Sequence, residues 1–392
     1  MTGAARATCI VALAGAVALS ATIVALAASA RSDGGEPLVI AVEGPQSGDQ
    51  ASNGLDQLRG VQLAVRHVNA HGGVLGRQVR IYKADDKGDK VNARAVARRV
   101  IGRGIRFVIG PYNSSVGIEN LPLYRNSGVL PVWNTSSDQT RGAGATVQPM
   151  NSQIAPIESR YIAQIGARRV TMLVDDTANG AFTSGMANRL TNRLRRTGVT
   201  VTRISVEEVF GPDGSRAVPA DYYAERVKEA LATAPDLIYV STYFPEGVEI
   251  ADALTAAGDS PRRKCLMGLA NVDSGFLGAT TLKEAQRCVF SGVVAAGQMP
   301  SARRYVQQYR RAFNKRPGVW GSFYYDSATI LFAAIERANS DRFGDVARAL
   351  RATRRFTGAT GVISIDSKSG YRTNVPVSIL TVNAKKEFVI AR

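Results

Sequence analysis

Two adjacent serines, Ser114 and Ser115, stand where a short apolar run gives way to the start of a predicted helix. The run is Phe107–Ile109, and Gly110 ends it. Hydroxyl groups at such a junction are typical of four kinds of site: a nucleophile, a phosphate cradle, a helix N-cap, or a seat for another anion. Other features of the sequence are needed to decide which of these four kinds of site the serines form.

Catalytic chemistry finds little support in the sequence. A serine nucleophile needs a histidine base, and the two histidines, His67 and His71, both lie at the end of one predicted helix. The chain has no G-x-S-x-G elbow and no glycine-rich phosphate-binding motif after a strand. The histidine spacing suits a metal, but Val68 stands where a zinc protease carries its glutamate. We predict no enzyme, no metal site and no cofactor.

The strong positive charge suggests a nucleic-acid partner, but its distribution does not. Lys and Arg outnumber Asp and Glu by 49 to 32, which gives a net charge of +17. The basic clusters, such as "NRLRRTG" and "RRYVQQYRR", are spread over many predicted helices and alternate with apolar positions. Such clusters are typical of solvated helix faces. We therefore predict no nucleic-acid partner.

The N-terminus predicts export. Thr8 to Ala30 contains no charge, Arg6 precedes it, and Ala28-Ser29-Ala30 has the small-x-small pattern of a signal-peptidase site. We expect residues 1–30 to be a signal peptide, removed after about Ala30, and the mature protein to be periplasmic. The alternative is an uncleaved segment that anchors the protein in the membrane, because the apolar run is long enough to span a bilayer.

Export makes the cysteines informative. Only Cys265 and Cys288 remain after cleavage, and an oxidising compartment favours their pairing. Each precedes a predicted strand, so both sulfurs lie at the same end of the sheet if the strands are parallel neighbours. The alternative is two buried free thiols.

The hydrophobic pattern predicts an α/β fold. Apolar runs such as "PLVIAVEG" and "RQVRIYKADD" alternate with amphipathic helical segments, and the alternation starts again after about residue 155. This pattern is typical of two doubly wound lobes with parallel sheets. Ligands bind such sheets beyond the carboxyl ends of the strands. The loops expected there, such as "WNTSSDQT", are rich in neutral hydrogen-bonding residues.

The same loops carry a family resemblance. The segment "VNAHGGVLGRQVRIYKADDKGDKVNARAVARRVI", followed by "VIGPYNSS", resembles the solute-binding proteins of branched-chain amino acid ABC transporters, which are type I periplasmic binding proteins. The segments "GVLPVWNTSSDQT", "YFPEG" and "FYYDSA" extend the similarity over the mature chain. The resemblance implies a monomer that closes on a small-molecule ligand and delivers it to an inner-membrane ABC permease. A sensor of the same fold that feeds a signalling partner is the alternative.

The resemblance also implies the lobes and the site. Three crossovers are expected near Asn151–Ser152, Gly297 and Gly361, so that lobe 1 is 37–151 plus 297–357 and lobe 2 is 152–296 plus 358–392. Ser114 corresponds to the serine that holds the ligand's carboxylate together with N–H groups at a helix start. The expected ligand-binding residues are Asn53, Ser114, Ser115, Asn134, Thr135, Ser136, Asn179, Tyr243, Ala270 and Asp273.

Three positions depart from the family pattern. Aromatic side chains are usual where Asn53 and Asn179 stand, and an acid that grips the ligand's ammonium is usual where Ala270 stands. Two acids are candidate replacements: Asp273 lies three residues along the same loop, and Glu246 follows Tyr243. We expect a cavity with smaller side chains and less negative charge, which favours a carboxylate without an amine, or an amide-like compound, over leucine, isoleucine or valine.

Overall fold

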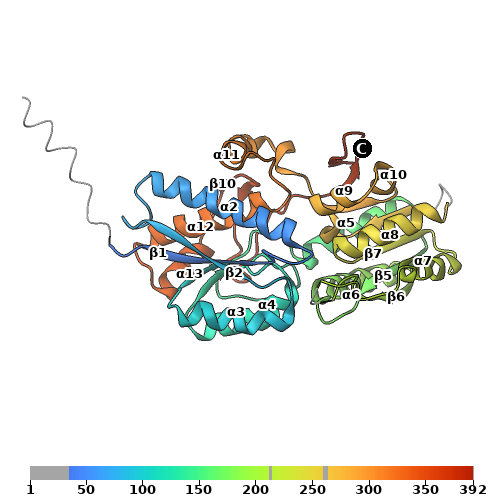
Figure 1. Ribbon diagram of the computed structural model, residues 1–392, viewed down its shortest axis with the longest axis horizontal. Helices are drawn as coiled ribbons and strands as arrows, with labels where there is room; N and C mark the ends of the chain where they lie inside the picture. Colours follow the sequence, from blue (N-terminus) through green and yellow to red (C-terminus); the bar gives the residue numbers. More distant parts are fainter. Residues whose placement is uncertain (1–34, 212–213, 259–263, 392) are drawn as a thin grey trace, which may run out of the picture.

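The computed structural model describes residues 35–211, 214–258 and 264–391. These residues form two lobes that lie side by side (Figure 1). The predicted signal peptide, residues 1–30, falls outside the described residues. Among the helices of the described residues, none is both long enough and apolar enough to cross a membrane.

Lobe 1 is built on a four-stranded parallel sheet. Its strands run in the order β2 (Val79–Asp85), β1 (Leu38–Gly44), β3 (Phe107–Ile109) and β4 (Leu130–Val132). Alternation along β1 sends Ile40 and Val42 into one apolar cluster and Ala41 into another. Both faces of the sheet are therefore covered, as expected for a parallel sheet.

Helices cover both faces of this sheet. Val61 of α2 (Ala51–Ala70) and Ile330 of α12 (Gly321–Ala338) share the cluster of Ile40, whereas α3 (Lys90–Gly102) and α4 (Ser114–Asn126) pack on the opposite face. Helix α13 (Phe343–Arg351) packs beside α12. A Cβ at Gly60 would lie 2.0 Å from the carbonyl oxygen of Gly321, so α2 and the start of α12 approach too closely for any side chain there.

Lobe 2 is built on a seven-stranded mixed sheet. The strands run in the order β13 (Phe388–Ile390), β12 (Val377–Val382), β9 (Val289–Val293), β8 (Lys264–Met267), β7 (Leu237–Ser241), β5 (Arg169–Asp175) and β6 (Thr200–Val206). Strands β5 to β9 are parallel, and the two C-terminal strands add to the edge in antiparallel pairing.

Four longer helices pack on this sheet. Helix α5 (Asn151–Gln164) lies beside α6 (Ala181–Arg195), and α7 (Tyr222–Ala232) lies beside α8 (Phe244–Ala256). Two short helices, α9 (Ser274–Ala279) and α10 (Leu282–Ala285), pack against α8. The α/β fold class predicted from the sequence is therefore confirmed.

Three segments of the chain join the two sheets. The first lies between β4 and α5, and the second follows β9 and leads to α11 (Arg303–Phe313), which packs beside α2. The third follows the hairpin of β10 (Phe356–Gly358) and β11 (Gly361–Ile363), and the chain re-enters the lobe 2 sheet at β12. The residue boundaries of the lobes stay a prediction.

Each lobe contains a buried glutamate that ties a helix to the sheet. Glu43 of β1 accepts hydrogen bonds from Asn120 and Tyr124 of α4, the latter at 2.7 Å. Glu158 of α5 accepts from the Tyr239 hydroxyl at 3.0 Å and from Ser291. Burial raises the pKa of both carboxyl groups to about 7, against the lowering effect of these donors.

Strands β8 and β9 are parallel neighbours, and a disulfide joins Cys265 to Cys288 at their amino ends. Both sulfurs belong to buried residues. The bridge closes a loop between residues 23 positions apart, which reduces the freedom of the unfolded chain.

We expect this disulfide to stabilise the protein by about 2–4 kcal/mol, the usual range for a loop of this kind. Urea unfolding of the mature protein, with and without reductant, measures the difference in the free energy of unfolding. Cys265→Ala should unfold at the same urea concentration as the reduced protein. Two free thiols found by Ellman assay on the denatured, non-reduced protein would contradict the bridge.

Candidate ligand site between the lobes

Loops at the carboxyl ends of the strands of both sheets enclose a cavity. Its volume is about 20 Å³, and about 260 Å³ when the space that opens to solvent is counted. The lining from lobe 1 is Tyr112, Ser114, Asn134, Ser136, Gln148 and Trp320. The lining from lobe 2 is Phe182, Tyr243, Leu269 and Ala270. Five of the ten sequence-predicted site residues therefore line it: Ser114, Asn134, Ser136, Tyr243 and Ala270.

Ser114 is the first residue of α4 and lines the cavity, but it does not cap the helix. The N-cap is Asn113, whose side chain makes no capping hydrogen bond among the described residues. The Ser114 Oγ instead accepts from the backbone N–H of Ser137 at 3.1 Å. Because the first turn of a helix leaves N–H groups without intrahelical partners, this end of the cavity presents donors and a positive dipole end.

The loop after β4 supplies the second polar wall. The Asn134 Oδ1 accepts from Ser327 of α12 at 3.1 Å, which fixes the amide against the cavity. Ser136 also lines the cavity, whereas Thr135 is fully buried and its Oγ1 donates to Thr140 at 2.6 Å. Asn134 and Ser136 therefore face the cavity, whereas Thr135 between them stabilises the loop through its hydrogen bond to Thr140.

The remaining sequence-predicted residues lie near the cavity without lining it. Ser115 is buried, and its hydroxyl has no hydrogen-bond partner among the described residues. Asn179 lies at the rim, where its Oδ1 accepts from the backbone N–H of Lys90 at 3.0 Å and so joins the lobes. Asn53 of α2 is buried opposite Asp273 of lobe 2.

Asp273 is a buried carboxyl at the contact between the lobes. It accepts from the N–H of Gly275 at 2.5 Å and thereby caps α9, while its Oδ2 is buried without a hydrogen-bond partner in the described part of the chain. Burial is the main cause that raises the pKa of Asp273 to about 7, while Ser52 and Asn53 of lobe 1 lower it. Opening the lobes would return this carboxyl to water.

Three aromatic side chains that sequence reasoning missed, Tyr112, Phe182 and Trp320, join the predicted Tyr243 in the cavity walls. Tyr112 and Trp320 form a ring pair 5.9 Å apart on the lobe 1 side, and Phe182 and Tyr243 form another 6.2 Å apart on the lobe 2 side. The expectation of smaller side chains is therefore wrong, because these rings come from positions other than Asn53 and Asn179. Gln148 and Leu269 were also missed.

The missed residues carried weak signals in the sequence. Tyr112 stands directly between the apolar run and the serines, so its place in the loop could have marked it. Trp320 precedes a long apolar helix and looks like one more core residue. Phe182 begins α6 and is equally ambiguous.

A buried aspartate holds the Trp320 segment in place. The carboxylate of Asp56 on α2 accepts from the N–H groups of Gly318 at 3.0 Å and Gly321 at 2.6 Å, which flank the tryptophan. The hydroxyl of Tyr309 also donates to Asp56 at 2.9 Å. These bonds oppose the effect of burial, which raises the pKa of Asp56. One side chain behind the cavity therefore orients an aromatic wall.

The cavity is electrically neutral. Among the described residues that line it, none is Asp, Glu, Lys or Arg. Ala270 stands where the family resemblance implies an acid, and it lines the cavity without bringing a charge. The described residues also contain no group of three or more His, Cys, Asp or Glu that could hold a metal ion.

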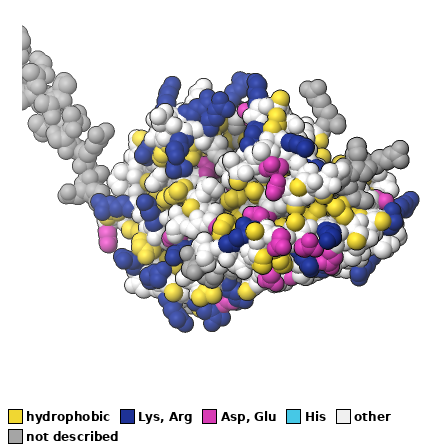
Figure 2. Space-filling model, turned by 45° about the vertical axis from the view of Figure 1, so that its right-hand side comes forward, with side chains coloured by type: hydrophobic (Ala, Val, Ile, Leu, Met, Phe, Trp, Pro, Cys, Tyr) yellow, Lys and Arg dark blue, Asp and Glu magenta, His cyan; other side chains and the backbone are white. Residues whose placement is uncertain are grey.

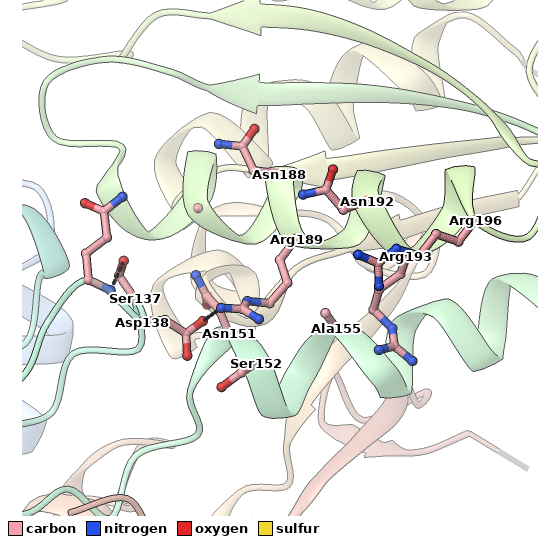
Figure 3. A pocket seen from close by; sticks show the side chains of 12 residues that line it. Ser137, Asp138, Asn151, Ser152, Ala155, Asn188, Arg189, Asn192, Arg193 and Arg196 are labelled. Atoms are coloured by element: carbon pink, nitrogen blue, oxygen red, sulfur yellow. Dashed lines mark hydrogen bonds and ion pairs between the residues drawn. The ribbon is translucent and has the colours of Figure 1, made fainter. Parts of the chain in front are cut away.

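A second, basic cavity of about 390 Å³ lies beside the first, between α5, α6 and the loop after β4 (Figure 3). Arg189 and Arg193 of α6 line it, together with Arg196, which directly follows the helix. Arg189 pairs at 2.8 Å with Asp138 of the lobe 1 loop, so this ion pair bridges the lobes. Both side chains are partly exposed, and pairs of this kind contribute little to stability.

Basic side chains on the molecular surface are dispersed. Figure 2 shows Lys and Arg over several separate parts of the visible face, with Asp and Glu between some of them. The arginines of the basic cavity lie next to the lobe contact, where Arg189 pairs with Asp138.

Comparison with known proteins identifies the family of this chain. A family model described as periplasmic binding protein matches residues 37–387. The chain belongs to the periplasmic binding protein family. Members of this family are substrate-binding proteins of transporters, and this periplasmic binding protein captures a small solute between its lobes for an ABC transporter.

Relatives and solved structures agree with this assignment. The chain is 28% identical over 333 residues to the Leu/Ile/Val-binding protein BraC3 of Rhizobium johnstonii, covering 83% of this chain and 87% of that protein. The leucine-binding protein LivK of Thermotoga maritima has the same fold, with a TM-score of 0.79, 22% identity and coverage of 90% of this chain and 97% of LivK.

A further structure with this fold was solved with a different kind of ligand. It is a solute-binding protein of an ABC transporter from Rhodopseudomonas palustris in complex with 3,4-dihydroxy benzoic acid, with a TM-score of 0.74 and 18% identity. The alignment covers 90% of this chain and 95% of that one. The fold is therefore shared by proteins whose ligands differ in chemistry.

We expect the lobes of this periplasmic binding protein to close more readily at pH 6 than at pH 8. Burial raises the pKa of Asp273 to about 7, and exposure on opening would lower it toward the usual aspartate value. Closure would therefore take up a proton and be favoured as the pH falls through about 7. Small-angle scattering of the ligand-free protein should give a smaller radius of gyration at pH 6. Asp273→Asn should be compact at both pH values.

The control for this experiment is Asp345→Asn, because Asp345 is a partly exposed acid of α13 that pairs within its own helix. It should keep the wild-type response to pH. An Asp273→Asn protein that also keeps that response would contradict the assignment of the proton to Asp273.

Proposed function

We propose that this protein is exported, loses its signal peptide after about Ala30, and captures a small carboxylate that carries no ammonium group. The closed form then delivers the ligand, as a monomer, to an inner-membrane ABC permease. The observation that carries the proposal is the lining of the cavity: hydroxyl groups and a helix N-terminus at one end, and no acidic side chain among the described lining residues.

The anion-binding end is formed by two elements of lobe 1. Ser114 opens α4, and Ser136 lies in the loop after β4, so both hydroxyls reach the same side of the cavity. The free N–H groups of the first helical turn add donors, and the helix dipole favours a negative charge there. A ligand carboxylate would accept from these groups without a counter-ion from the protein.

The described lining residues offer an ammonium group no binding site comparable to the anion-binding end. A charge buried without a partner costs several kcal/mol or shifts its own pKa, and Ala270 offers no charge. Asp273 lies behind the lining, against Asn53 and Ser52 of the other lobe, and its raised pKa shows that this site disfavours the carboxylate. Glu246 is buried beneath the rim, where it accepts from the N–H of Val209 at 3.1 Å.

The similar proteins provide precedents for both kinds of ligand. BraC3 is named for leucine, isoleucine and valine, whereas the Rhodopseudomonas protein holds a dihydroxybenzoic acid, which has a carboxyl group and no amine. The neutral lining supports a ligand of the second chemical type for this chain.

Ligand transfer depends on closure of the two proposed lobes, 37–151 plus 297–357 and 152–296 plus 358–392. A ligand favours the closed form only through contacts with both lobes at once, and the lining contains residues of both. The hinge would be the three joining segments, as in other clefts that close by bending.

A panel of matched compounds tests whether the ligand lacks an ammonium group. Leucine, isoleucine and valine should bind more weakly than their 2-keto acids, which keep the side chain and the carboxylate but lack the amine. Isothermal titration calorimetry on the mature protein measures each dissociation constant. Submicromolar binding of leucine that is lost in Asp273→Asn would contradict the proposal and assign the ammonium to that aspartate.

Ser114→Ala should weaken binding of a carboxylate ligand by about 10- to 150-fold, the equivalent of the 1.5–3 kcal/mol that a hydrogen bond to a charge contributes. The melting temperature should fall by only a few degrees, because the variant loses one neutral bond to the Ser137 N–H. Ser115→Ala is the control: that hydroxyl does not line the cavity, so affinity should stay unchanged. Equal losses of affinity in both variants would argue against a direct bond from Ser114.

A further inference from the structure

Each lobe contributes one aromatic pair to the cavity. Tyr112 and Trp320 come from lobe 1, and Phe182 and Tyr243 come from lobe 2. All four side chains are more than nine-tenths buried although they line a cavity. We infer that the carboxylate ligand of this protein is aromatic, with its ring held between the aromatic pairs of the two lobes; this inference rests on the proposed function.

The lobes have to part further to admit a flat ring, because the cavity that the pairs line is only about 20 Å³ in this structure. Within each pair the ring planes are tilted, by 57° in one and 51° in the other. Tilted pairs are among the arrangements in which aromatic groups attract each other beyond simple burial, so a ligand ring that enters between the two pairs can make contacts of the same kind. A ligand ring would therefore gain contacts from both lobes at once and favour closure.

Two lining residues also carry polar atoms that have no partner. The Nε1 of Trp320 and the Oε1 of Gln148 are buried without a hydrogen bond among the described residues. An unpaired buried donor or acceptor costs free energy that a suitable ligand group recovers. A hydroxyl on the ring can accept from the indole N–H and donate to the amide oxygen, so a hydroxylated ring fits better than a plain one.

The charges around the cavity agree with this ligand class. The carboxylate would lie at the start of α4, beside Ser114 and Ser136. The other lining residues are neutral, and an aromatic ring with hydroxyl groups brings no second charge at neutral pH. Aliphatic side chains, by contrast, would fill the space without using the tilted ring faces.

Benzoate and cyclohexanecarboxylate form the decisive pair of probes, because they share the carboxylate, its charge and nearly the same size. Calorimetry on the mature protein should show benzoate binding at least tenfold more tightly, and 4-hydroxybenzoate more tightly again. Benzamide, which lacks the charge, and phenylalanine, which adds an ammonium, should both bind more weakly than benzoate.

Tyr243→Leu and Phe182→Leu should each reduce the advantage of benzoate over cyclohexanecarboxylate by severalfold, because each variant weakens binding of benzoate more than binding of cyclohexanecarboxylate. Phe276→Leu is the matched control, because Phe276 is a buried lobe 2 aromatic that pairs with Phe290 and does not line the cavity. It should keep the wild-type ratio even if its melting temperature falls.

The outcomes separate this inference from the proposed function. Equal affinity for benzoate and cyclohexanecarboxylate, or no binding of benzoate, would overturn the aromatic ligand. Tight binding of cyclohexanecarboxylate or of the aliphatic 2-keto acids would at the same time leave carboxylate capture standing. Leucine as the tightest ligand would overturn both.

Discussion

Desolvation of polar groups at the lobe contact is the constraint on which the site depends. Closing the lobes buries strand-end loops made of serine, threonine and asparagine, and each buried polar group costs free energy unless it is paired. The structure pairs most of them internally: Ser114 accepts from Ser137, and Asn134 accepts from Ser327. Few polar atoms are left for a ligand, and those few decide what binds.

Buried carboxyl groups behind the cavity organise the walls. Asp56 holds the segment that carries Trp320, Glu43 ties β1 to α4, and Glu158 ties α5 to the lobe 2 sheet. None of them lines the cavity. These buried carboxyl groups therefore hold the surrounding elements in place while the lining stays neutral. One set of side chains positions the cavity walls, and another faces the ligand.

The local sequence pattern predicted the fold class, and the family resemblance predicted five of the ten residues that line the cavity. Strands and helices have different hydrophobic periods, so their alternation can be read from the sequence, and this alternation predicts parallel sheets. Cys265 and Cys288 precede two strands that are parallel neighbours in the structure. Ser114, Asn134 and Ser136 lie in or next to the loops that follow β3 and β4, where this fold binds ligands and where the family resemblance applies. Phe182 and Trp320 were not predicted, because an aromatic residue at a helix start looks the same whether it meets a core or a cavity.

The contacts between the lobes could not be predicted from the sequence either. Asn179 meets the backbone of Lys90, and Asn53 meets Asp273, across a closure whose geometry depends on three separate joining segments. The antiparallel addition of β12 and β13 to the sheet edge has the same origin, since pairing over almost a hundred residues of chain leaves no local pattern.

The close approach of Gly60 to Gly321 has a consequence for engineering. Because no side chain fits between α2 and the start of α12, a library built to change ligand preference should keep both glycines and Asp56 fixed and vary only the lining. Ala270 is the first position to vary in such a library, because it faces the cavity and takes part in none of the side-chain hydrogen bonds that hold the walls in place. Biosensors for new solutes could thus be drawn from this scaffold without rebuilding its architecture.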